Sequence, residues 1–418
     1  MDQKETVDGT GADIAGRRGG TVAAWLAMVI VLVAIGCYAL YRPAGNADLV
    51  DYIATVNLWR GMSGQALSDA TYRDVAAYLS PAQFADVTGA AGDSNLNRNA
   101  YLRALASDPS ALAEQIPFYS VKPLYPGLML TLGAVGVPLG LASVLISSVS
   151  FGLLGLLLFA WTRRHLGPWR AWLATTLIVL SPPFWVLAQL SSPDALCLLL
   201  VAASLFAFAE LRRPGLTVAF LLVAILARPN VALLALAVVG VSALARPSSG
   251  VRMRWPLALG TGGIVVLTVV LLTRLSGNYG LGTLFYHGVV AWLAHPALGA
   301  PALPLSEVLR LYAFRTVQLA TSPVPLFVFL GVLILFLRIR SFGEILDDAV
   351  SLAVAAALIA ILAGWLAYPS EPERILVGSF LVIAVALVAA VGDVSGTHVR
   401  ARAALPGRAG IRDGRRPL

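Results

Sequence analysis

Apolar residues along this chain gather into long blocks separated by short polar segments. The blocks cover residues 21–40, 124–162, 171–190, 195–210, 215–227, 231–245, 256–273, 324–337, 350–367 and 375–391. A helix needs about 20 apolar residues to cross the hydrocarbon core of a bilayer. The pattern therefore predicts an all-α fold, a polytopic bundle of about 10–11 transmembrane helices, with no soluble domain of any size.

Composition agrees with a membrane protein. Hydrophobic residues make up 58% of the 418 residues and charged residues only 12%, whereas soluble domains carry about a quarter charged residues. Cys37 and Cys197 both lie inside apolar blocks, so they provide neither a disulfide framework nor a metal-ligand spacing. The net charge of +8 comes from arginines clustered beside the blocks, which indicates membrane orientation rather than binding of nucleic acid.

The blocks divide the chain into two tails and one membrane domain. Residues 1–20 are expected to be a cytoplasmic N-terminal tail, 21–392 the transmembrane domain, and 393–418 a basic, disordered cytoplasmic tail. The block 21–40 is too long for a signal-peptide core and no small-residue cleavage site follows it, so we expect it to remain as a helix. A long polar stretch, 41–122, then precedes the next block.

Arginine clusters predict the orientation. They lie at 163–170, 212–213, 246–254, 338–340 and after residue 400. Cytoplasmic loops carry an excess of Lys and Arg, so these segments are placed in the cytoplasm. On the opposite side, 41–122 becomes the first extracytoplasmic loop and 274–322 the second. The block 124–162 then connects an outer loop to a cytoplasmic one, so it must cross the membrane an odd number of times, although it is long enough for two short helices. Its first part, to about Pro138, is therefore expected to be either re-entrant or interfacial.

The first outer loop opens with an acidic motif, Asn46-Ala47-Asp48-Leu49-Val50-Asp51-Tyr52. In a helix, Asp48, Asp51 and Tyr52 share one face by three- and four-residue spacing. Two carboxylates so close repel each other, which raises the pKa of one of them and suits general-base catalysis. The alternative is a solvated acidic start to an external loop.

The same loop ends with a lone lysine among aromatic residues and prolines, in Pro117-Phe118-Tyr119-Ser120-Val121-Lys122-Pro123-Leu124-Tyr125-Pro126. After residue 4, Lys122 is the only lysine in the chain. It either binds an anionic headgroup or, with Tyr125, acts as an ordinary interfacial anchor.

Three further outer segments carry charge. Ser191-Ser192-Pro193-Asp194 opens a helix, where capping alone would explain Asp194. Arg228-Pro229-Asn230 and Glu371-Pro372-Glu373-Arg374 are short turns with arginine on the side where arginine is scarce. Charges at the membrane edge are costly and tend to be functional. In the second outer loop the histidines have no metal-site spacing, and Ser306–Ala320 is expected to be an interfacial amphipathic helix.

The order of these motifs resembles that of the membrane glycosyltransferases of the GT-C fold, the class containing protein O-mannosyltransferases and the lipid A aminoarabinose transferase. Members show an acidic Asp-x-x-x-Tyr motif, a Lys-Pro-Pro-Leu-Tyr-Pro-like segment, Pro-Asp, Arg-Pro, and a late acidic-Arg motif. The resemblance covers residues 20 to 392. The chain departs from the pattern in having one proline after Lys122, Ile375 in place of a tyrosine, non-adjacent Asp48 and Asp51, and no C-terminal soluble domain.

The resemblance implies an inverting transfer of a sugar from a polyprenyl-phosphate donor to a lipid, glycan or protein acceptor, at the extracytoplasmic face of the plasma or inner membrane. It implies that Asp48, with Asp51 beside it, is the catalytic base. Three cations would bind the donor phosphate: Lys122, Arg228 and Arg374. The implied reaction does not require a metal ion. Four residues would orient these groups or hold a divalent cation: Asp194, Glu373, Tyr52 and Tyr125.

Two other classes of function compete with this interpretation. The chain is alternatively a lipid-linked saccharide flippase or other transporter, although no internal repeat is visible and few polar residues lie within the spans. It is alternatively a non-catalytic membrane protein whose second outer loop binds a partner. The sequence leaves the sugar, the acceptor and the oligomeric state open.

Overall fold

The computed structural model describes residues 9–91, 95–338, 342–369, 378–388 and 390. Within these ranges every regular element is a helix, and the single β-type pairing is an isolated bridge between Ala44 and Leu190. The predicted all-α class is therefore confirmed.

Several helices are suited to a membrane by length and composition. Among the described residues, four are long and apolar enough to cross a bilayer: α1 (Gly9–Tyr41), α8 (Leu139–Thr162), α14 (Trp255–Leu275) and α19 (Ala349–Ala367). A fifth is obtained if α16 (Leu305–Ala320) and α17 (Val324–Arg338), which are bent by 72°, count as one broken span.

Shorter apolar helices complete the bundle. They are α7 (Leu124–Ala134), α11 (Asp194–Ala209), α12 (Pro214–Ala227), α13 (Val231–Leu244), the stretch Leu281–Val290 formed by α15 (Leu281–Phe285) and η3 (Tyr286–Val290), and a last helix, Gly378–Val388. A multi-pass membrane protein is thus supported, while the number of 10–11 spans stays a prediction.

Two apolar blocks are subdivided in the structure. In the block 171–190, α9 (Pro168–Leu180) ends before Pro182, and α10 (Pro182–Trp185) and η1 (Val186–Ala188) follow, because proline cannot donate the backbone hydrogen bond of a continuing helix. In the block 124–162, α7 is only about 16 Å long at 1.5 Å per residue, about half the hydrocarbon thickness. By length and composition α8 alone suits a crossing, which favours a single pass for this block.

The segment 41–122, predicted to be the first outer loop, forms a compact helical unit. Its helices are α2 (Asp48–Trp59), α3 (Gly64–Ala76), α4 (Pro81–Val87), α5 (Leu96–Ser107) and α6 (Pro109–Ser120). Four of them, α2, α3, α4 and α6, share a hydrophobic core with α7, in which Leu49, Ile53, Leu112 and Met129 are fully buried. In the sequence these five helices have the appearance of one polar stretch.

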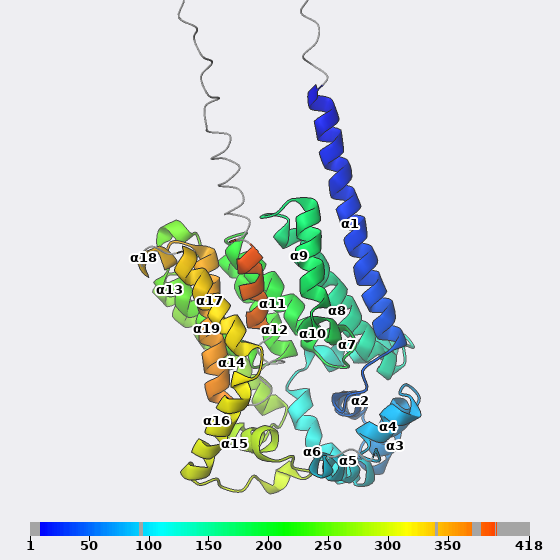
Figure 1. The fold of residues 1–418 in the computed structure, drawn as a ribbon. Coiled ribbons are helices and arrows are strands. Elements are labelled where there is room, and N and C mark those ends of the chain that lie inside the picture. Colours follow the sequence, from blue (N-terminus) through cyan, green and yellow to red (C-terminus); the bar gives the residue numbers. More distant parts are fainter. Residues whose placement is uncertain (1–8, 92–94, 339–341, 370–377, 389, 391–418) are drawn as a thin grey trace, which may run out of the picture.

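The connecting segments collect at two opposite ends of the bundle (Figure 1). At the loop end, formed by 41–122 and 274–322, Gln115 Nε2 donates to Leu293 O at 2.9 Å and Asn278 Nδ2 donates to Pro117 O at 3.3 Å. At the arginine end, formed by 163–170, 210–213, 246–254, Arg338 and 342–348, Arg164 pairs with Glu210 at 3.0 Å. Among the described residues, the two loop segments lie at one end and the arginine-rich segments at the other, while the face on which each end lies stays a prediction.

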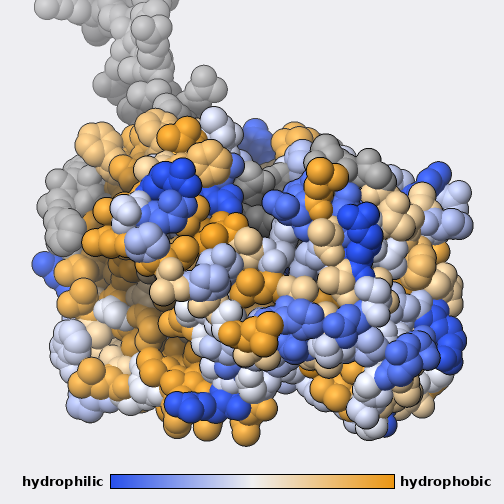
Figure 2. Space-filling view, turned by 90° about the horizontal axis from the view of Figure 1, so that it is seen from below, coloured by the Kyte–Doolittle hydropathy of each residue, from blue (hydrophilic) through white to orange (hydrophobic). Residues whose placement is uncertain are grey.

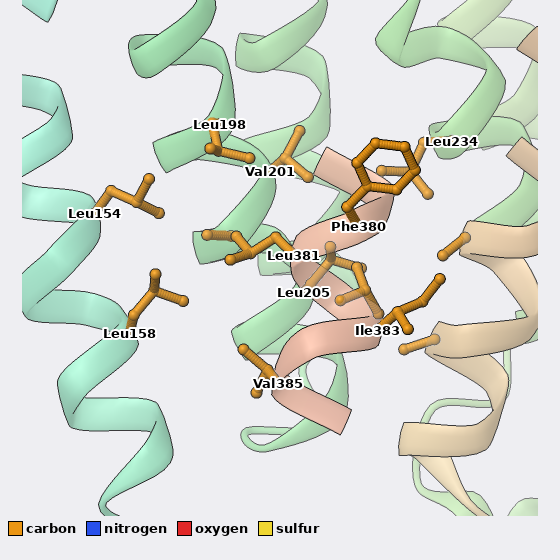
Figure 3. Packing of buried hydrophobic residues seen from close by; sticks show 14 of the residues in the cluster. Leu154, Leu158, Leu198, Val201, Leu205, Leu234, Phe380, Leu381, Ile383 and Val385 are labelled. Atoms are coloured by element: carbon orange, nitrogen blue, oxygen red, sulfur yellow. The ribbon is translucent and has the colours of Figure 1, made fainter. Parts of the chain in front are cut away.

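The last helix fills the centre of the bundle (Figure 3). Phe380, Leu381 and Ile383 are fully buried between α8 and α11 on one side and α13 and α19 on the other. Two further short elements, α18 (Phe342–Ile345) and the 3-10 turn η2 (Pro247–Ser249), lie at the arginine end, and the 3-10 turn η4 (Pro296–Leu298) lies at the loop end.

Candidate functional site

The acidic motif forms the first turn of α2. Asp48, Asp51 and Tyr52 share one face of this helix, as their spacing predicts. The positive end of the helix dipole favours carboxylates in a first turn. Asp48 is partly exposed, whereas Asp51 retains 2% and Tyr52 1% of their accessible surface. One carboxylate is therefore reachable from outside and the other is enclosed.

The end of α6 closes over this face of α2. The Tyr119 hydroxyl donates a hydrogen bond to Asp48 Oδ1 at 3.1 Å, and its ring meets the Tyr52 ring edge to face at 5.0 Å. The ammonium of Lys122 lies 4.7 Å from the centre of the Tyr119 ring and 5.7 Å from that of Tyr52. Cations are attracted to aromatic faces, so the two tyrosines hold Lys122 beside the carboxylates.

The environment of Asp51 favours its neutral form. Burial raises the pKa of Asp51 to about 8, and the nearby charge of Asp48 adds to the effect. The hydrogen bond from Tyr119 and the charge of Lys122 act in the opposite direction without cancelling it. At neutral pH, Asp51 therefore keeps its proton, because burial and the adjacent charge of Asp48 both disfavour its ionised form. We name Asp48, Asp51, Tyr52, Tyr119 and Lys122 the carboxylate cluster.

Tyr125 joins the carboxylate cluster to the membrane bundle. Its ring lies 4.9 Å from that of Tyr52, and its hydroxyl donates to Ser143 O in α8 at 2.8 Å. The Ser143 hydroxyl in turn donates to Ser191 Oγ at 3.0 Å. One turn further along α8, Ser147 donates to Ser192 O, also at 3.0 Å. A row of buried hydroxyl groups therefore leads from the cluster to the start of α11.

A buried ion pair lies at the far end of this row. Asp194, the first residue of α11, pairs with Arg228, which ends α12, and Ser192 Oγ donates to Asp194 Oδ2 at 2.8 Å. The side chains retain 1% and 15% of their accessible surface. Both line a cavity whose other walls are mostly apolar: Cys197, Leu198, Val201, Val231, Leu234 and Ala360. The pair thus lies in the wall of a small cavity of about 50 Å³, which Asn230 and Ser379 also line.

Most of the predicted site residues are assembled. Asp48, Asp51, Tyr52 and Lys122 meet in one cluster, Tyr125 adjoins it, and Asp194 and Arg228 form the connected ion pair. Arg374 and Glu373 lie outside the described residues. Among the described residues, no group of three or more His, Cys, Asp and Glu side chains is placed to hold a metal ion. The divalent cation stays a prediction.

Sequence reasoning assigned no role to Tyr119, Ser143 or Ser147. Tyr119 precedes Lys122 by three residues, so the motif that indicated the lysine already contained it. The two serines carried a weaker signal, a four-residue repeat of hydroxyl groups within the apolar block 124–162, which places both on one helix face.

Comparison of the chain with protein-family models, curated proteins and solved structures gave no match. The resemblance to the GT-C class therefore rests on the sequence motifs and their order along the chain.

Proposed function

We propose that this protein is a glycosyltransferase that moves a sugar from a polyprenyl-phosphate donor to an acceptor hydroxyl, with inversion at the anomeric carbon. The observation that supports the proposal best is the meeting of an accessible carboxylate, Asp48, with Lys122, close to a buried Asp194–Arg228 pair in the wall of a small cavity. Transfer from a lipid phosphate sugar needs a base for the acceptor hydroxyl and cations for the phosphate.

Asp48 is the general base of the proposed reaction. Its carboxylate takes the proton of the acceptor hydroxyl while that oxygen forms a bond to the anomeric carbon. Tyr119 orients the carboxylate through its hydrogen bond. Asp51 is a poor base at neutral pH because its pKa of about 8 keeps it protonated. Its role is to hold the local geometry without adding a second negative charge.

Cations stabilise the leaving group. The bond between the anomeric carbon and the phosphate oxygen breaks, and polyprenyl phosphate leaves with the electron pair. Its growing negative charge is stabilised by preorganised cations, for which Lys122 and Arg228 are the described candidates. The guanidinium of Arg228 is held by Asp194, and its buried Nε makes no hydrogen bond to any described residue. This N–H is a further donor for a phosphate.

Purified full-length protein tests the proposal when it is incubated with a radiolabelled polyprenyl-phosphate sugar and membrane extract as the source of acceptor. We expect transfer of label, its loss in Asp48→Asn, and normal transfer in the matched control Asp69→Asn, an exposed carboxylate of the same loop. Absence of transfer together with movement of the labelled lipid across proteoliposome membranes would replace the proposal with a flippase.

A further inference from the structure

The loop end carries a second group of aromatic side chains outside the carboxylate cluster. Trp292 stacks on Tyr101 with ring centres 6.2 Å apart and an interplanar angle of 25°. Tyr101 meets His287 at 5.7 Å, and His287 stacks on Phe118 at 4.9 Å. We name these four residues the aromatic platform. It joins α5 and α6 of the first outer loop to the second outer loop.

Buried hydrogen bonds fix the platform in place. The Tyr101 hydroxyl donates to Gln115 Oε1 at 3.1 Å, and Gln115 Nε2 donates to Leu293 O at 2.9 Å. Gln115 is fully buried. The backbone N–H of Leu293, the residue after Trp292, donates to His287 Nδ1 at 3.0 Å. Although 42% of Trp292 is exposed, it is backed by Tyr101 and its neighbouring backbone is held, so its ring presents a pre-ordered surface.

The platform carries no formal charge at neutral pH. Burial lowers the pKa of His287 to about 4, so the imidazole is neutral at pH 7. Because its Nδ1 accepts a hydrogen bond from Leu293, the proton lies on Nε2. The exposed surface therefore consists mainly of the flat ring of Trp292 with its indole N–H, which suits a neutral ligand with both C–H and O–H groups.

The platform adjoins the carboxylate cluster through α6. Phe118 belongs to the platform, and the next residue, Tyr119, donates to Asp48. The charges of Asp51 and Asp48 also reach Tyr101, whose pKa is raised by burial first and then by these two carboxylates. A ligand resting on Trp292 and Tyr101 is thereby close to the proposed base.

We propose that Trp292 and Tyr101 form an acceptor subsite that stacks the ring of a neutral sugar. The face of an aromatic ring has negative electrostatic potential, which attracts the weakly positive C–H groups on one face of a sugar ring, while the indole N–H is available to a hydroxyl. The inference rests on the proposed function, since it takes the sugar to be part of an acceptor glycan. It narrows the acceptor from any lipid, protein or glycan to one that ends in a neutral sugar.

Saturation-transfer NMR on the detergent-solubilised full-length chain tests the subsite. The probes are the neutral trisaccharides mannotriose, cellotriose and maltotriose. We expect saturation of ring C–H protons of at least one probe with the wild type, binding about tenfold weaker in Trp292→Ala, and partial retention in Trp292→Phe. The matched control is Trp169→Ala, since Trp169 in α9 is 50% exposed and lies near the arginine end.

Two results would overturn the subsite. One is the absence of binding of every probe to the wild type, and the other is equal binding to wild type and Trp292→Ala, as expected if Trp292 only anchors the protein at the membrane interface. The transfer assay on the same preparations separates this inference from the proposed function. Trisaccharide binding that depends on Trp292, without any transfer, supports a sugar site and refutes the transferase. Transfer by the wild type, with an unchanged acceptor KM in Trp292→Ala, supports the transferase and refutes the sugar subsite.

Discussion

The Tyr119 hydroxyl donates a hydrogen bond to Asp48 Oδ1 at 3.1 Å, although the two residues are 71 positions apart in the chain. This contact joins the first helix of the outer loop to the last one. The Tyr119 ring also packs on Tyr52 and supports Lys122. One side chain thus contacts both a carboxylate and the cation beside it.

Replacing Tyr119 with Phe separates these two contacts. The ring contacts survive in Tyr119→Phe, but the hydrogen bonds that favour the ionised carboxylates are lost, so the pKa values of Asp48 and Asp51 rise. We expect the acidic limb of the pH profile of transfer to move to higher pH, with a loss of about 1 kcal/mol of stability. The measurement is kcat/KM from pH 5 to 9, and an unchanged profile would contradict the role of the hydroxyl.

The two carboxylates are expected to differ in their effect on transfer. Asp48→Asn keeps the size of the side chain and removes the proposed base, so transfer should fall by about 10²-fold or more. Asp51→Asn replaces a carboxyl group that is already neutral at pH 7 and should cost much less. Initial rates at saturating donor, normalised to folded protein, measure both. Near-normal turnover in well-folded Asp48→Asn would contradict the assignment.

Protein stability provides a second, independent measurement of Asp51. Its pKa rises from 3.8 when unfolded to about 8 in the fold, so between these values the folded chain holds a proton that the unfolded chain has released. The stabilisation from this proton is complete below pH 4 and disappears as pH rises to 8. Asp51→Asn has no such proton. We therefore expect its Tm, relative to the wild type in the same detergent, to increase steadily from pH 4 to 8, and a constant difference would refute the raised pKa.

Local patterns in the sequence predicted much of this fold. Runs of apolar residues located α11, α12, α13 and α14 to within a few residues, because the hydrocarbon requirement is a property of each segment alone. The sequence also predicted that Asp48, Asp51 and Tyr52 share one face, because their spacing determines this in any α-helix.

Contacts between distant segments were beyond that reasoning. The approach of Tyr119 to Asp48, the pairing of Asp194 with Arg228 and the stacking of Trp292 on Tyr101 depend on how α2, α6 and the second outer loop pack. The order of the motifs suggested that some of them meet, but it contained no information about which atoms face each other. The helical folding of 41–122 was also missed, since its moderate hydropathy gave no sign of a shared core.

Cysteine labelling tests which end of the bundle faces outward. In a background without Cys37 and Cys197, single cysteines at Ser107 and Gly282 lie in exposed positions of the loop end, and one at Ser248 is exposed at the arginine end. We expect an impermeant thiol reagent applied to intact cells to modify the first two and to spare Ser248→Cys, which should react after permeabilisation. The reverse pattern would invert the orientation and move the proposed site to the cytoplasm.

Single and double variants of the Asp194–Arg228 pair distinguish a structural role of the pair from a role in binding the donor. Arg228→Gln alone leaves the buried carboxylate of Asp194 uncompensated, which costs about 3–5 kcal/mol, so we expect a large fall in Tm in detergent. Combining it with Asp194→Asn removes both charges, and most of the lost stability should return.

If Arg228 also contacts the phosphate, the stable double variant still lacks a charge-assisted contact of about 1.5–3 kcal/mol. Its kcat/KM for the donor should then remain about 10- to 100-fold below the wild type. Recovery of both stability and donor kinetics in the double variant would confine the pair to a structural role.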